Sequence, residues 1–138
     1  MSRSKDRREA QRWLETAAED LRAAQALVEA GFHAHACFTA QQSAEKAMKA
    51  AWYLIGEAPW GHSIQRLVMD FPQKEQLPLE KLLDLARTLD RLYVPTRYPN
   101  GLPDFTPEQN FCAADSRQAL DLAECFLKIL SAWVNAGN

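Results

Sequence analysis

The feature that most constrains the fold is a stretch of 22 residues, 34–55, that carries almost no charge. Its only charged residues or histidines are His35, Glu45, Lys46 and Lys49, and most of the others are alanine or larger apolar residues. A helix that is apolar on more than one side packs against neighbours on more than one side. We therefore expect a helix over about residues 32–55 to lie at the centre of a bundle, with its alanines allowing close approach.

The rest of the chain also has helical periodicity. It contains 22 alanines and only five glycines, and no segment alternates apolar and polar residues as a half-buried strand does. Three local signals mark helix ends: Gly31 after the first helix, Pro95 after a later one, and Thr106 as the N-cap of the last, with Pro107 and Gln109 completing a capping box. The expected helices cover residues 4–30, 32–55, 63–69, 79–93 and 106–134. We predict an all-α, up-down bundle of four to five helices.

Length and charge limit the number of domains and the class of partner. With 138 residues the chain is long enough for a single domain, which we assign to residues 1–138. The net charge of −2 gives no global attraction to nucleic acid or to an anionic membrane. Residues 1–12, however, carry three excess positive charges. We expect residues 1–7 to form a frayed, solvated arm, with phosphate contact as the alternative.

The three cysteines, Cys37, Cys112 and Cys125, suggest a reducing compartment. Their count is odd, no two are spaced as CxxC, and all fall in apolar helical patterns typical of small buried side chains. No apolar run has the length of a membrane span, and the charged start lacks a signal-peptide core. We expect a cytoplasmic protein without membrane contact.

The most unusual polar residues lie inside the predicted central helix. At 100° per residue, Gln41 and Glu45 share one stripe with Phe38 and Trp52, whereas Gln42, Lys46 and Lys49 lie on another face. Buried amides and carboxylates need partners. Two interpretations stay open. Gln41 and Glu45 either satisfy groups on neighbouring helices, such as Arg22 or Arg97, or they line a polar pocket or dimer contact.

A second group of candidates lies outside that helix. Residues 94–107 contain four prolines, which argues against regular structure there, and this long loop also carries Arg97 and Tyr98. His33 and His35 are two residues apart, so on a helix they cannot bind one metal together. His62 precedes Ser63 and suits a helix start better than catalysis. We therefore expect no metal and no cofactor, and only weak catalytic candidates in His62, Arg97 and Tyr98.

These residues together resemble one family. The pattern comprises Trp13, then Glu19-Asp20-Leu21, then the segment AQQSAEKA at 40–47, then His62-Ser63-Ile64 and finally Thr96-Arg97-Tyr98-Pro99. It resembles the HEPN domain, the higher eukaryotes and prokaryotes nucleotide-binding domain, in its small stand-alone prokaryotic form. The resemblance covers about residues 8–134.

The resemblance implies a fold and several functions. The fold would be a HEPN-like helical bundle, like that of nucleotidyltransferase substrate-binding subunits. Such domains often form homodimers, and many pair with a minimal nucleotidyltransferase as a toxin–antitoxin couple. Others are metal-independent ribonucleases, and nucleotide binding has been proposed for the whole family. The binding residues we expect here are Gln41, Gln42, Glu45, Lys46, Lys49, Arg97 and Tyr98.

The ribonuclease motif of the family is missing. It consists of an arginine followed, after four to six residues, by a histidine, and none of His33, His35 and His62 has an arginine at that spacing. We therefore expect a binding module that recognises a nucleotidyltransferase partner, a nucleotide or RNA, rather than an enzyme. A ribonuclease and a purely structural dimerisation domain remain the alternatives.

Overall fold

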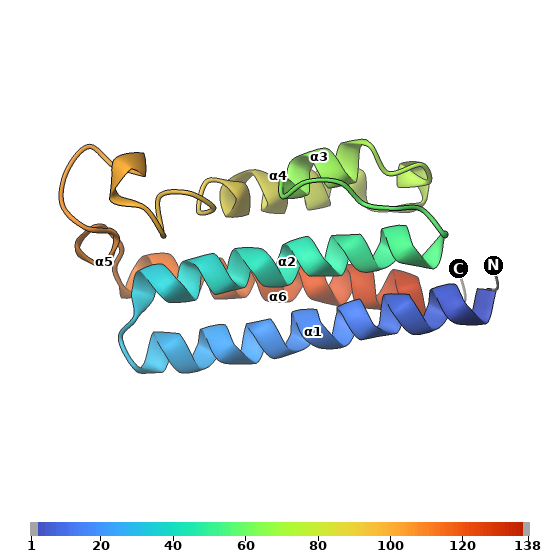
Figure 1. Cartoon of the computed structure of the whole chain (residues 1–138), viewed down its shortest axis with the longest axis horizontal. Helices are drawn as coiled ribbons and strands as arrows, with labels where there is room; N and C mark the ends of the chain where they lie inside the picture. The colour runs from blue at the N-terminus through green and yellow to red at the C-terminus, as the bar shows by residue number, and fades with distance from the viewer. Residues whose placement is uncertain (1–2, 137–138) are drawn as a thin grey trace.

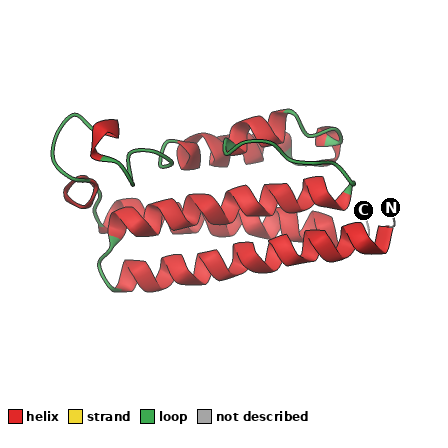
Figure 2. Cartoon of the chain, viewed as in Figure 1, coloured by secondary structure: helices red, strands yellow, loops and turns green. Residues whose placement is uncertain are grey.

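The computed structural model describes residues 3–136, and it contains helices and no strand in that range (Figure 2). The long helices are α1 (Arg3–Glu29), α2 (His33–Leu54), α4 (Leu79–Asp90) and α6 (Ala113–Asn135). Two short helices, α3 (Ile64–Met69) and α5 (Pro107–Asn110), and two 3-10 turns, Lys74–Gln76 and Pro99–Gly101, complete the described chain. Residues 3–7, expected as a frayed arm, form the first turns of α1.

The four long helices run in alternate directions, so the bundle is up-down as predicted (Figure 1). Helix α1 and helix α6 lie along α2, and α3 and α4 cover another side of it. Helix α2 contacts all five of the other helices. It is therefore the central helix that its low charge predicted.

Small side chains let α1 and α2 approach closely. Seven alanines of α2, from Ala34 to Ala51, are almost completely buried. Five of them, from Ala40 to Ala51, share one core with Ala10, Ala17 and Ala24 of α1, which are equally buried. The hydroxyl of Ser43 donates to the carbonyl of Ala17 at 2.7 Å. A side-chain bond to the backbone of a neighbouring helix requires this close approach. Gly31, with φ at +84°, then allows the chain to reverse after α1, as predicted.

The last helix differs from the prediction. Thr106 and Gln109 do form the capping box, but the helix that they start, α5, ends at Asn110. Phe111 and Cys112 are extended, and α6 begins again at Ala113, where the backbone N–H of Cys112 donates to the carboxylate of Asp115 at 2.8 Å. A second start signal thus follows the first at once, and two helices form where one was expected.

Two smaller expectations also need correction. The helix predicted to reach Tyr93 ends at Asp90, and turns carry the chain on through Arg97. The proline-rich loop includes a single 3-10 turn at Pro99–Gly101. Both differences reflect local hydrogen bonds of turns, which apolar periodicity does not report.

The cysteines are not uniformly buried. Cys37 is fully buried, Cys125 is half-buried and Cys112 is exposed at the start of α6, so the expectation fails for Cys112. Burial raises the pKa of the Cys37 thiol to about 12, and the nearby Asp115 adds to the rise. None of the helices within residues 3–136 is long and apolar enough to cross a membrane.

Candidate functional site

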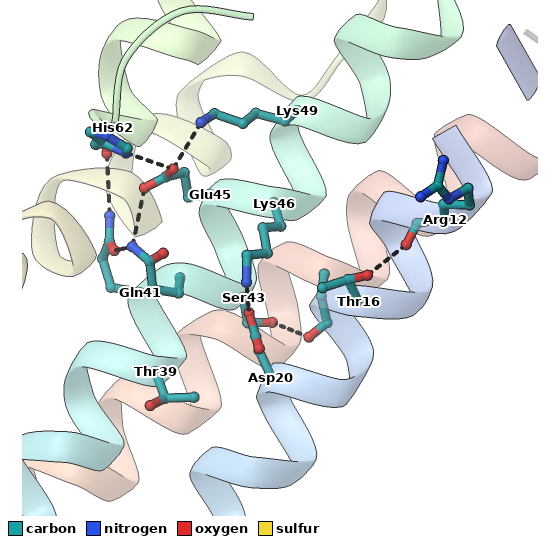
Figure 3. Close-up of polar contacts among 12 residues, drawn as sticks. Arg12, Thr16, Asp20, Thr39, Gln41, Ser43, Glu45, Lys46, Lys49 and His62 are labelled. Carbon is teal, nitrogen blue, oxygen red and sulfur yellow. Dashed lines mark hydrogen bonds and ion pairs between the residues drawn. The ribbon is translucent and has the colours of Figure 1, made fainter. Parts of the chain in front are cut away.

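Glu45 is the centre of a polar cluster on α2. Its side chain is almost fully buried, and its Oε2 accepts from Lys49 Nζ at 3.0 Å and lies 3.1 Å from His62 Nδ1 (Figure 3). Its Oε1 accepts from Gln42 Nε2 at 3.3 Å. The partners of this carboxylate are therefore Lys49, His62 and Gln42, and not Arg22 or Arg97.

Two glutamines connect this cluster to the loop that carries His62. Gln41 is completely buried, and its Nε2 donates to the carbonyl of His62 at 3.3 Å. Its Oε1 accepts from Gln42 Nε2 at 2.8 Å. Both the backbone and the ring of His62 are thus bonded to α2.

The loop is also held from the side of α4. Ser63 is the N-cap of α3 and accepts from the backbone N–H of Arg66. The carboxylate of Asp90, at the end of α4, accepts from the backbone N–H groups of Ile64 and Gln65, both at 2.9 Å. Because these donors have no partner within the helix, Asp90 acts as a second cap from another element.

His62 presents a ring edge to solvent. Its side chain is 61% exposed, and its ring stacks on that of Tyr93 with centroids 5.4 Å apart and planes 17° apart. Since Nδ1 faces Glu45, Nε2 is the ring nitrogen that remains for a ligand. The sequence placed Tyr93 at the end of the helix expected over 79–93, with no contact assigned to its ring, so this stacking was not predicted.

The guanidinium of Arg97 lies against three aromatic rings. Its guanidinium carbon lies 4.4 Å from the ring centroids of Phe38 and Tyr93 and 4.9 Å from that of Tyr98. Its Nε donates to the carbonyl of Tyr93 at 3.0 Å. A guanidinium that stacks on rings in this way gains about 0.5–2 kcal/mol and is oriented by them.

We call this cluster the His62–Arg97 site. Tyr93 joins its two halves, because both the His62 ring and the Arg97 guanidinium contact the Tyr93 ring. Its members are Phe38, Gln41, Gln42, Glu45, Lys49, His62, Tyr93, Arg97 and Tyr98.

Lys46, which the sequence grouped with Gln42 and Lys49, lies elsewhere. It points toward α1, where its ammonium is 2.7 Å from the carboxylate of Asp20 (Figure 3). A shallow open pocket of about 240 Å³ borders it, lined by Glu9, Arg12, Trp13, Thr16 and Lys46. The face predicted from Gln42, Lys46 and Lys49 is therefore divided: Gln42 and Lys49 belong to the His62–Arg97 site, and Lys46 faces α1.

The other histidines have separate partners. His33 Nδ1 lies 2.8 Å from the Ser116 hydroxyl, and His35 Nδ1 lies 3.0 Å from the Glu108 carboxylate. No group of three or more histidine, cysteine, aspartate or glutamate side chains within residues 3–136 is placed to hold a metal ion. Glu108 also accepts from the backbone N–H of Ala34, so α5 anchors the start of α2.

Comparisons with known proteins agree on one family. The family model described as the HEPN domain matches residues 10–135. The fold is similar to the crystal structure of TT1696 from Thermus thermophilus, with 38% identity, a TM-score of 0.84, and coverage of 89% of this chain and 96% of that one. No curated protein matches the chain.

Two further structures carry the family name. ST0689, an archaeal HEPN homologue, is 28% identical with a TM-score of 0.77, covering 91% of this chain and 98% of its own. A HEPN domain protein from Thermotoga maritima, TM0613, is 27% identical with a TM-score of 0.70, covering 90% and 98%. The helical bundle and the family match over nearly the whole chain lead to one conclusion: this chain belongs to the HEPN domain family.

Proposed function

We propose that this HEPN domain binds a nucleotide at the His62–Arg97 site. The observation that carries the proposal is the placement of Arg97. Within residues 3–136 the only hydrogen bond of its guanidinium is the one from Nε to the Tyr93 carbonyl, so the terminal nitrogens remain for a ligand. An oriented guanidinium is suited to donate two parallel hydrogen bonds to a phosphate.

Aromatic surface beside that guanidinium suits a nucleobase. Tyr98 is half exposed, and the exposed ring of His62 lies on Tyr93. Bases stack on tyrosine, histidine and arginine planes without a requirement for a particular sequence. A phosphate on Arg97 with a base on a nearby ring is the arrangement that these side chains support.

The local charges also favour an anion. The carboxylate of Glu45 is compensated by Lys49, and that of Asp90 is bonded to two backbone N–H groups. The charge of Arg97 has no carboxylate partner within the described part of the chain. It is therefore the group that a phosphate neutralises.

The test is calorimetric titration of the purified protein with ADP and with GDP. We expect Arg97→Ala to weaken binding by about 10–100-fold, because hydrogen bonds to a charged group are worth about 1.5–3 kcal/mol. Arg97→Lys should recover only part of this loss, since a lysine cannot form the bidentate contact. Circular dichroism should show an unchanged fold.

Arg87→Ala is the matched control, because Arg87 is exposed on α4 and, among residues 3–136, forms an ion pair only with Asp84. It should bind as the parent does. Absence of binding by the parent, or equal affinities of the parent and Arg97→Ala, would contradict the proposal.

We also propose that the protein acts as a homodimer and pairs with a minimal nucleotidyltransferase, the partner that the family resemblance implies. Exposed aromatic side chains favour a protein partner: Trp60 is 84% exposed and Phe105 is 67% exposed. Phe105 also has φ at +62°, and Asn110 bonds to the carbonyls of Asp104 and Thr106 on either side of it. Strained positions held in this way occur mostly where function requires them.

Light scattering after gel filtration tests the dimer, and co-purification with a nucleotidyltransferase encoded beside the protein tests the partner. We expect Trp60→Ser or Phe105→Ser to weaken one of these associations. A monomeric parent that retains no nucleotidyltransferase would refute the proposal.

Ribonuclease activity is the alternative that a specific contact supports, since the carboxylate of Glu45 adjoins an exposed imidazole of His62. The motif of arginine and histidine remains absent from the sequence. Incubation of the purified protein with RNA in the presence of EDTA separates this function from binding alone, with His62→Ala as the control for a contaminating nuclease.

A further inference from the structure

We infer that Glu45 is a positioning residue that holds His62 with its hydrogen on Nδ1, so that Nε2 is an acceptor that faces a ribose hydroxyl of the ligand. The first part concerns the free protein. Only the second part, the hydroxyl, rests on the proposed nucleotide binding.

The direction of the hydrogen follows from the carboxylate. An ionised carboxylate can only accept, so the ring nitrogen that faces it carries the hydrogen. His62 Nδ1 is 3.1 Å from Glu45 Oε2, and the ammonium of Lys49 donates to that same oxygen at 3.0 Å. Lys49 therefore holds the carboxylate in position independently of His62.

The imidazole is also prevented from turning. Its stack on Tyr93 sets the plane of the ring, and the bond from Gln41 to the His62 carbonyl sets the backbone. Because Nδ1 is engaged on the buried side while the side chain as a whole is 61% exposed, Nε2 is directed away from the core. In a histidine oriented by a carboxylate, the bond of one nitrogen decides the role of the other.

The charged and titratable groups around His62 come from three places. Glu45 and Lys49 approach from α2, Asp90 from the end of α4, and Tyr93 and Arg97 from the segment after α4. The Asp90 carboxylate is bonded to Ser63, Ile64 and Gln65, and the Arg97 guanidinium lies over Tyr93. Glu45 is thus the carboxylate that bonds the His62 ring.

This tautomer selects the chemistry of the ligand. A neutral imidazole with hydrogen on Nδ1 can only accept at Nε2, and the donors beside the phosphate of a nucleotide are the ribose hydroxyls. His62 and Arg97 both contact the Tyr93 ring, so one nucleotide can reach both. A site built to bond a hydroxyl rejects the analogue that lacks it, because its polar group is then left unpaired.

The direct test needs no ligand. Long-range ¹H–¹⁵N spectra of the ¹⁵N-labelled protein at pH 8 report which nitrogen of His62 carries the hydrogen, with His62→Ala assigning the signal. We expect Nδ1 in the protonated range and Nε2 in the unprotonated range. The opposite pattern, or two averaged signals as in a free imidazole, would overturn the inference.

Variants then separate the acceptor from the charge. Glu45→Gln keeps an oxygen that can accept from Nδ1 and should retain the tautomer, whereas Glu45→Leu removes the acceptor and should shift His62 toward hydrogen on Nε2. Lys49→Met is the second variant, for the case in which Glu45→Leu does not fold, because it removes the charge beside Glu45 and keeps the carboxylate that accepts from Nδ1. It should retain the tautomer. An unchanged His62 signal in folded Glu45→Leu would contradict the role of Glu45.

The hydroxyl is tested by titrating the parent with ADP and with its 2′-deoxy and 3′-deoxy analogues. We expect one analogue to bind about tenfold or more weakly, and His62→Ala to remove that difference. Equal affinities for all three would refute the hydroxyl contact and leave the tautomer unaffected. No binding of any of them would instead refute the nucleotide proposal.

Discussion

Glu45 shows at the residue scale how a charged side chain is kept inside an apolar helix. The residue is 3% exposed, and its carboxylate receives hydrogen bonds from Lys49, His62 and Gln42. Since an unpaired buried charge costs several kcal/mol, the charged carboxylate of Glu45 can be buried only because these partners bond it. No buried polar side-chain atom within the described residues lacks a hydrogen bond. Burial has a different consequence for Cys37, since it raises the pKa of the thiol and keeps it neutral.

The Cys37 thiol should make stability depend on alkaline pH. Its pKa is raised by burial from 9.0 to about 12, so the folded chain keeps it neutral where the unfolded chain ionises it. The stabilisation is complete below about pH 9 and is lost as pH rises from 9 toward 12. We expect Cys37→Ala to lower the free energy of unfolding by about 1 kcal/mol at pH 8.

By pH 10.5 the lower stability of Cys37→Ala should vanish or reverse. The parent loses about 2 kcal/mol of its free energy of unfolding through the thiol, and the variant has no thiol at this position. Urea denaturation of both proteins at the two pH values measures the difference. Cys125→Ala, at a half-buried cysteine, is the comparison. A deficit that is the same at both pH values would contradict the expectation.

At the scale of helices, the ends are held by residues far away in the sequence. Asp90 of α4 caps α3, and Glu108 of α5 accepts from Ala34 at the start of α2. The first of these contacts fixes the loop that ends in His62. The His62–Arg97 site therefore depends on a cap that belongs to another helix.

Replacing Asp90 by alanine should lower the free energy of unfolding by about 0.5–2 kcal/mol, the usual cost of losing an N-cap acceptor. It should also weaken nucleotide binding, because the loop of His62 is no longer held to α4. Asp84→Ala is the control on the same helix, since Asp84 is exposed and its one ion pair in the described part of the chain is with Arg87. Equal stability of the two variants would show that Ser63 alone caps α3.

At the scale of the whole molecule, the close contact between α1 and α2 determines what the bundle tolerates. Ala17 is fully buried, and its carbonyl accepts from Ser43 of α2. Both helices have alanines along this contact. Their separation is therefore set by methyl groups, and a larger side chain has no space between them.

Ala17→Leu should lower the free energy of unfolding by about 1–3 kcal/mol, because overpacking forces the two helices apart. Ala23→Leu makes the same change at an exposed position of α1 and should alter stability by less than about 0.5 kcal/mol. Thermal unfolding of the two variants and the parent gives the comparison. A similar melting temperature for both variants would mean that the contact can adjust.

The sequence identified most residues of the candidate site but not the contacts between them. The stripe of Gln41 and Glu45, and the loop with Arg97 and Tyr98, are visible as unusual residues in an apolar helix and in a proline-rich segment. Their pairing is not visible: the sequence suggested Arg22 or Arg97 as partners for Gln41 and Glu45, whereas the partners of Glu45 are Lys49, His62 and Gln42. Tyr93 was missed as the shared ring, since its spacing matched an ordinary core position.

The helical bundle follows from local sequence information. The low-charge segment 34–55 required a central helix, and apolar periodicity with Gly31 and Ser63 located the helices to within a few residues, except for the start of the last long one. These properties depend on neighbours along the chain, and the spacing of residue types records them.

Two features of the molecule required the three-dimensional arrangement, and a third required the local hydrogen bonds of a helix start. His62 bonds Glu45, Lys46 turns toward Asp20, and the last helix is interrupted at Cys112. The first two contacts join segments from different parts of the chain, and the interruption depends on competition between adjacent caps. Helical periodicity contains neither kind of information.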